Sequence, residues 1–285
     1  MTDQYEPPPQ LNITDDASTS AIWRRWLFGL WQQVQGGLVS DFALEVVRGN
    51  VTGIGGVNKF GTNLAVGTSF EDIWIQGGTW TKLPAATTLD VSSSNANDTV
   101  AGSGAQTLTI EGLDANYDEL SETVDMNGQT PVVTTGVFLF VNRTYVSRGG
   151  SGFTNAGDIY VADDSTAHTS GVPNTAAAIQ SKVVATQGQS QQAIYTLPAG
   201  KTGYITNAWI IAGASKIVDY ELHKIDHQAQ TNRIIIEGEE TNTAFNHIYN
   251  PYEPVLEKNT LAFEAKITSG TAEISAGFDL YLVDN

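Results

Sequence analysis

The sequence has no cysteine among its 285 residues. Disulfides, thiolate nucleophiles and cysteine-ligated zinc or iron–sulfur centres are therefore excluded. Basic residues are also scarce, because 14 lysines and arginines stand against 31 acidic residues and give a formal net charge of -17. Such a chain repels a phosphate backbone, so we expect no nucleic-acid partner.

Long apolar runs are missing as well, and none reaches the roughly 20 residues that span a bilayer. Residues 1–10 are acidic and proline-rich, unlike a signal peptide, which has a basic and then an apolar region. Hydrophobic residues make up 41% of the chain, and 28 glycines accompany many Thr, Ser, Val and Ile residues. This composition predicts an all-β protein with many short strands and tight turns.

Composition divides the chain into three regions. We predict an N-terminal anchoring arm with one amphipathic helix over residues 1–40 and an antiparallel β domain over residues 41–184. A C-terminal β-sandwich of jelly-roll type is predicted over residues 185–285. In this last region, short strands are expected at 202–211, 217–225, 233–237, 260–267 and 272–283, the close spacing of which is typical of a sandwich.

The arm contains the only strongly amphipathic helical pattern. Asp15, Asp16 and Ser18 supply N-cap candidates, and Gly36-Gly37 supplies a stop, which predicts a helix over residues 18–35. Apolar side chains recur along it at helical spacing. They are Ile22, Trp23, Trp26, Leu27, Leu30, Trp31 and Val34.

This apolar stripe needs a cover. One reading is that the helix packs on its own β domain. Another reading is a helix on a membrane surface. Arg24-Arg25 fits this reading, but anionic lipid would repel the acidic chain. We favour docking into a groove on another subunit, with Trp23, Trp26 and Trp31 as anchors, because buried aromatic residues dominate interface energetics.

The middle region shows strand alternation and repeated turn residues. Phe42, Leu44 and Val46 alternate and predict a strand. Asn127-Gly128, which lies between two β-rich segments (122–124 and 131–133), predicts a hairpin because both positions tolerate positive φ.

The histidines and acidic residues do not form a convincing catalytic or metal site. His223 and His227 share one face of a predicted strand about 13 Å apart, too far to share a metal, so we expect surface or turn residues. The alternating residues Asp114, Asn116 and Asp118 leave a calcium site as an open alternative, although the segment lacks the glycine and closing glutamate of an EF-hand. The densest cluster of acidic residues lies in one segment that we interpret as a solvated hairpin. They are Glu111, Asp114, Asp118, Glu119, Glu122 and Asp125.

Tryptophans offer the remaining chemistry. Trp74, Trp80 and Trp209 are candidates for stacking on a sugar, but the apolar strands around Trp74 and Trp209 favour a core position for both. We therefore predict no enzyme activity, no metal and no cofactor.

Short motifs in a fixed order give the chain a resemblance that covers about residues 46–285. The motifs are Asn58-Lys-Phe-Gly61, Phe70-Glu-Asp-Ile-Trp74, Ala96-Asn-Asp-Thr99, Ala101-Gly-Ser-Gly-Ala105, Ile110-Glu-Gly-Leu-Asp-Ala-Asn-Tyr-Asp-Glu119, Ser121-Glu-Thr-Val124, Asn155-Ala-Gly-Asp-Ile159, Tyr195-Thr-Leu-Pro-Ala-Gly-Lys-Thr202 and Ser275-Ala-Gly-Phe-Asp-Leu280. Together they resemble a family of virion structural proteins of tailed bacteriophages, many from marine and aquatic hosts. The resemblance excludes the arm and supplies no catalytic residues.

The resemblance implies an accessory structural protein of a phage particle, assembled in the host cytoplasm and anchored through its arm. Its expected partners are capsid, portal, adaptor or tail subunits and other copies of itself, with a trimer expected first. Tail or head–tail attachment is favoured over capsid decoration. The alternative is a receptor-binding adhesin that recognises host glycan through the C-terminal sandwich.

Overall fold

A computed structural model describes residues 41–213, 216–241 and 244–285, which divide into two compact units at Thr52/Gly53. In the first unit, helix α2 (Phe42–Val47) replaces the strand predicted from Phe42, Leu44 and Val46. The strand prediction was wrong because Asp41 caps a helix instead: its side chain accepts a hydrogen bond from the Ala43 N–H at 3.1 Å.

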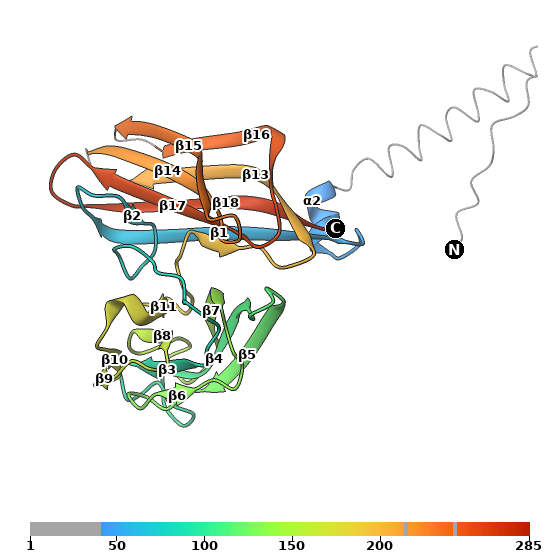
Figure 1. Cartoon of the computed structure of the whole chain (residues 1–285). Coiled ribbons are helices and arrows are strands. Elements are labelled where there is room, and N and C mark those ends of the chain that lie inside the picture. The colour runs from blue at the N-terminus through green and yellow to red at the C-terminus, as the bar shows by residue number, and fades with distance from the viewer. Residues whose placement is uncertain (1–40, 214–215, 242–243) are drawn as a thin grey trace, which may run out of the picture. The chain divides into compact units, whose positions relative to one another are not determined.

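The second unit, Gly53–Asn285, is built from antiparallel sheets, and its long strands form a sandwich (Figure 1). One sheet contains, in spatial order, β1 (Ile54–Val66), β18 (Ala272–Asp284), β13 (Lys201–Ala212) and β16 (Ala244–Val255). The other contains β12 (Ile194–Thr196), β17 (Asn259–Ile267), β14 (Ile217–Asp226) and β15 (Thr231–Thr241). This interleaved strand order is that of a jelly roll.

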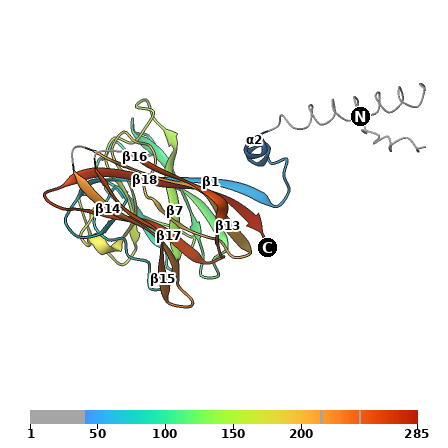
Figure 2. The ribbon, with the colours of Figure 1, turned by 90° about the horizontal axis from the view of Figure 1, so that it is seen from above.

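The jelly roll is completed from a distant part of the chain. Strand β1 pairs antiparallel with β18 along nearly its whole length, and the two run side by side in both views (Figures 1 and 2). The predicted sandwich, residues 185–285, therefore lacked a strand that the sequence places at residues 54–66.

The edge strand next to β17 is split. Short strand β2 (Glu71–Asp72) pairs with Ala265 and Glu264, and β12 pairs with residues 260–262 further along the same strand. Between these two pieces the chain leaves at Ile73 and returns at Ala193, whose N–H donates to the Ile73 carbonyl at 2.8 Å. Residues 74–192 are thus an insertion in one edge strand, and the predicted boundaries at 41 and 184 divide the jelly roll differently from these pairings.

The insertion forms its own layers of short strands around a separate core. One sheet contains β11 (Ile179–Val183), β8 (Ile159–Asp163), β3 (Leu89–Ser93) and β6 (Val132–Val133). The others contain β5 (Glu119–Asp125), β4 (Ala105–Leu113) and β7 (Phe140–Gly149), and β10 (Val172–Pro173) with β9 (His168–Thr169). The 3-10 helix η1 (Ala176–Ala178) precedes β11. Leu108, Ile110, Phe138 and Ile159 are fully buried between the sheets.

The hairpin predicted at Asn127-Gly128 does not form. Gly128 has the expected positive φ of 62°, but β5 pairs with β4 and β6 pairs with β3. The Gly128 N–H donates instead to the Asp98 carbonyl at 2.7 Å, and Asn127 forms a bridge with Thr99. The turn residues therefore fixed a local conformation without choosing the strand partners.

Alternating burial explains the remaining jelly-roll strands. In β18, Ile274, Ala276, Phe278 and Leu280 are buried in the core, and the residues between them are the outward-facing ones, except that Gly277 is covered. The predicted strands at 202–211, 217–225, 233–237, 260–267 and 272–283 correspond to β13, β14, β15, β17 and β18. Within the described ranges, no helix is long and apolar enough to cross a membrane.

Candidate functional site

The predicted docking residues fall outside the described part of the chain. All seven lie in residues 1–40, so the docking helix stays a prediction. They are Ile22, Trp23, Trp26, Leu27, Leu30, Trp31 and Val34.

A cleft of about 540 Å³ lies where β1 and β13 of the jelly roll approach β4, β5 and β7 of the insertion. Charged side chains of both signs line it. They are Lys59, Glu111, Glu119, Arg143 and Lys201.

Lys59 is the most perturbed of these groups. It is 7% exposed, and its Nζ donates a hydrogen bond to the backbone carbonyl of Asn142. The pKa of Lys59 is lowered to about 7, mainly by burial and also by Arg143, while Glu111 opposes the decrease. A lysine with such a pKa is chemically suited to act as a base or nucleophile. Here its hydrogen bond joins β1 to the insertion.

One lysine of the cleft lining takes part in two ion pairs. Lys201 Nζ lies 3.2 Å from Asp284 and 3.8 Å from Glu119. Burial raises the pKa of the neighbouring Tyr195, as do Glu119 and Glu111. The cleft therefore presents charged groups of both signs beside the buried Lys59 and Tyr195.

A second polar cluster surrounds His223. Its Nε2 lies 2.9 Å from Glu221 and 3.8 Å from Glu264, and its Nδ1 lies 2.9 Å from Asn232. The expectation that His223 lies at the surface was wrong, because the residue is 6% exposed. His227 follows β14 and contacts Thr260 Oγ1 at 2.8 Å. In the described part of the chain, no group of three or more His, Asp or Glu side chains could hold a metal ion.

Asp72 lies beside this cluster on the split edge strand. It is 5% exposed, and its Oδ2 accepts the Trp80 N–H at 2.7 Å. Burial raises the pKa of Asp72 to about 7; Glu264 also raises it, while the Trp80 N–H and His223 lower it.

The acidic segment between β4 and β5 forms a hairpin, as expected. Asp114 Oδ1 accepts the N–H groups of Asn116 at 2.7 Å and Asp118 at 3.0 Å, which closes the turn. Glu122 accepts the N–H groups of Thr135 and Gly136 at 2.9 and 2.6 Å. These carboxylates therefore stabilise backbone.

Several motif residues in the insertion hold loops together through hydrogen bonds. Asp98 is fully buried, and its carboxylate accepts hydrogen bonds from Ser93 Oγ and from the N–H groups of Ala105, Ala156 and Gly157 at 2.6–2.9 Å. One acidic side chain thus joins three motifs that are up to 59 residues apart.

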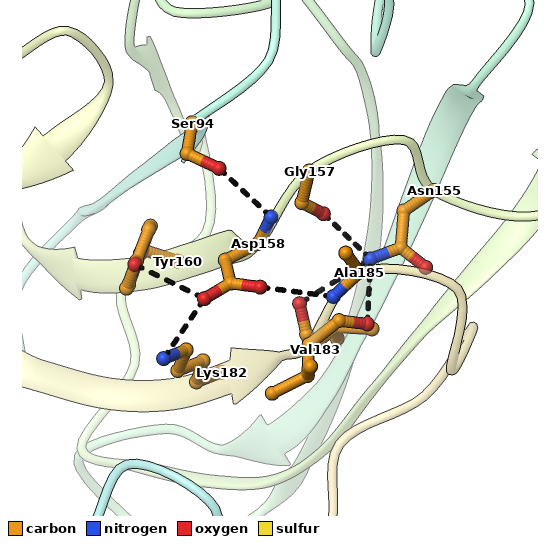
Figure 3. A network of polar contacts seen from close by, with 9 residues as sticks. Ser94, Asn155, Gly157, Asp158, Tyr160, Lys182, Val183 and Ala185 are labelled. Carbon is orange, nitrogen blue, oxygen red and sulfur yellow. Dashed lines mark hydrogen bonds and ion pairs between the residues drawn. The ribbon is translucent and has the colours of Figure 1, made fainter.

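A related network holds the start of β8 (Figure 3). Asp158 accepts the Ala185 N–H at 2.9 Å and pairs with Lys182 at 3.0 Å, while its own N–H donates to Ser94. Asn155 donates to the carbonyls of Gly157, Val183 and Val184. The motif over residues 155–159 therefore serves the fold.

The sugar-stacking candidates separate clearly. Trp74 is 2% exposed, as expected, and Trp80 is partly buried against Phe140. The core position expected for Trp209 was wrong: its neighbours Ala208 and Ile210 point into the core, and Trp209 is partly exposed on the outer face. Sequence reasoning missed this because two-residue alternation does not say which set of residues faces inwards.

Comparisons with known proteins add little to this geometry. No protein-family model matches the chain. No curated protein matches it. Solved structures of infectious bursal disease virus, Gt and Gx strains, are similar at 11% identity, with TM-scores of 0.21 and 0.22. The similarity covers 81% of this chain and 71% and 72% of theirs. These scores carry no argument about function, and the jelly roll is assigned from strand order alone.

Proposed function

We propose that the chain is a non-enzymatic accessory structural protein of a tailed-phage particle, assembled in the host cytoplasm and held by residues 1–40. A single terminal anchor suits an appendage, so tail or head–tail attachment is favoured over capsid decoration. The partners are capsid, portal, adaptor or tail subunits and further copies of the chain, as a trimer.

The observation that carries the proposal is the use made of the motif residues. Asp98, Asn155 and Asp158 carry the resemblance to phage structural proteins, and each is engaged in holding loops. In this chain these three residues hold backbone segments together, which is the role expected in a scaffold. The jelly roll, with its interior filled by side chains, supports the same reading.

Deleting residues 1–39 tests the anchor. We expect the truncated protein to fold, because the jelly roll and insertion use strands from residue 54 onwards. It should be missing from purified particles, as measured by quantitative mass spectrometry against the full-length chain. Normal incorporation of the truncated protein would overturn the proposal.

A finer variant locates the anchor. Replacing Trp23, Trp26 and Trp31 by alanine should reduce incorporation as the deletion does. Phe153→Ala is the matched control, because Phe153 is 92% exposed and lies in the insertion. Equal loss with both variants would show that the tryptophan stripe has no special part in docking.

A receptor-binding adhesin is the second candidate function. The observation that favours it is the outer face of the sheet β1-β18-β13-β16, where Trp209 and Phe60 lie among polar side chains. Loss of attachment to host cells on blocking this face, with particles otherwise intact, is the result that supports it.

A further inference from the structure

Three rows of residues cross the outer face of the sheet β1-β18-β13-β16. Strand register fixes each row, because each β18 residue lies between one residue of β1 and one of β13. The rows are Asn58–Asp279–Asn207, Phe60–Gly277–Trp209 and Thr62–Ser275–Ile211. We call these nine residues the aromatic–polar face.

The central row holds a tryptophan lying across a glycine. A Cβ added to Gly277 would meet the Trp209 ring at 2.7 Å, so the indole lies over the backbone of β18. Both Trp209 and Phe60 are partly exposed, although each is an apolar ring on an outward-facing position. A partly exposed indole above a glycine offers aromatic surface on which a sugar ring can stack.

The first row is polar and pre-arranged by hydrogen bonds. Asn58 donates to Asp279 Oδ1, and Asn207 donates to Asp279 Oδ2 at 3.5 Å. A carboxylate flanked by two amides offers donors and acceptors in one line. Strand geometry places this line roughly 7 Å from the aromatic row.

The third row adds hydroxyl groups on the other side. Thr62 Oγ1 and Ser275 Oγ lie 2.8 Å apart, and either can act as donor. The third residue of this row, Ile211, is 48% exposed and extends the apolar surface beside Trp209. An apolar platform with hydrogen-bonding groups along its borders matches a pyranose, which has an apolar ring face and a rim of hydroxyls. It matches a wholly apolar protein surface less well.

Charge narrows the ligand further. Asp279 is the one charged side chain in the three rows, and the chain carries a net charge of -17. Sialylated or uronic-acid sugars are therefore repelled. We propose that the aromatic–polar face binds neutral glycan, with Trp209 stacking on the sugar ring and Asp279 accepting its hydroxyl groups. The inference rests on the second candidate function and names its site.

The test uses the full chain on an array of neutral hexose-terminated and sialylated oligosaccharides, followed by titration calorimetry with the best neutral binder. Trp209→Ala should weaken neutral glycan binding about tenfold or more, and Trp209→Phe should restore part of it. Phe153→Ala, an exposed aromatic residue of the insertion, should change nothing. Asp279→Asn should also weaken binding, because one strong acceptor is lost.

Several results would overturn the proposal. These are no binding to any neutral glycan, preference for sialylated glycans, or neutral binding that Trp209→Ala leaves intact while thermal melting shows both proteins folded. A change in oligomeric state by Trp209→Ala in analytical ultracentrifugation, without glycan binding, would assign the face to a second copy. Glycan binding with no effect on host attachment would remove the adhesin function and leave the site.

Discussion

The side-chain amide of Asn142 pairs with the backbone of Thr196 as a strand would. Asn142 Oδ1 accepts the Thr196 N–H and Asn142 Nδ2 donates to the Thr196 carbonyl, both at 2.9 Å. Asn142 belongs to β7 of the insertion, and Thr196 belongs to β12 of the jelly roll. Both residues are buried, so this pair replaces a ladder between the two parts of the chain.

Asn142→Ala should therefore destabilise the protein by about 2–4 kcal/mol, because it leaves a buried N–H and a buried carbonyl of Thr196 without partners. Asn97→Ala, at an exposed position of the insertion, should change the free energy of unfolding by less than about 0.5 kcal/mol. Urea denaturation followed by tryptophan fluorescence measures both. Equal effects of the two variants would contradict a structural role for the Asn142–Thr196 pair.

Lys59, which donates to the carbonyl of the same Asn142, should make stability depend on pH. Its pKa falls from 10.5 to about 7 on folding. Below pH 7 both the folded and unfolded states carry the proton, and the full cost of burying the ammonium is present. Between pH 7 and 10.5 the unfolded state binds more protons, so stability rises with pH by at most about 1.4 kcal/mol per unit.

Lys59→Met should remove this rise, as measured by denaturation at pH values of about 6, 8 and 10. Two neighbouring charged residues provide variants that should shift the pKa of Lys59 in opposite directions. Glu111→Gln should move the start of the rise to lower pH, because Glu111 raises the pKa of Lys59, and Arg143→Gln should move it higher. A rise that persists in Lys59→Met would show that other groups cause it.

Asp72 should make stability fall, rather than rise, with increasing pH, and at lower pH values than Lys59. Burial raises its pKa from 3.8 to about 7, so between these values the folded state binds more protons than the unfolded state. Its contribution to stability therefore falls as pH rises from about 4 to 7, and above pH 7 the full cost of the buried carboxylate is present.

Asp72→Asn should be more stable than the natural protein above pH 7 and equal to it near pH 4, since an amide oxygen can still accept the Trp80 N–H. Glu264→Gln should lower the pKa of Asp72 and so narrow the pH range over which stability declines. Denaturation across this pH range is the measurement. If the stability of Asp72→Asn declines with pH by the same amount, other residues cause the decline.

The strands that could be read from sequence are those whose alternation is strong and uninterrupted. Residues 272–283 alternate cleanly and form β18. Strand β16 was missed because Pro251 and Pro254 argue against a strand, and as an edge strand β16 tolerates them. Strand β1 was not predicted, because Gly55-Gly56 at its start is typical of a turn.

The split edge strand had no local signal at all. Its two halves end at Asp72 and begin again at Ile194, and both are recognised only by pairing with β17. The same holds for the candidate sites. Nothing around Lys59 in the sequence marks a buried lysine. The Trp209 ring lies over β18 only because Gly277, on that strand, has no side chain.

Gly61 in β1 tests how closely that strand packs on the split edge. A Cβ at Gly61 would lie 2.2 Å from the Ile73 carbonyl oxygen and 2.3 Å from the Ala193 nitrogen, both backbone atoms of the edge strand. Neither can rotate away, so Gly61→Ala should force β1 outwards and cost roughly 3 kcal/mol or more of stability.

Gly55→Ala is the control on the same strand, because a Cβ there meets nothing within 4 Å. Its urea midpoint should match or slightly exceed that of the natural protein, since alanine restricts the unfolded chain. If both variants unfold at the same urea concentration, β1 does not pack directly on the residues where the insertion leaves and returns.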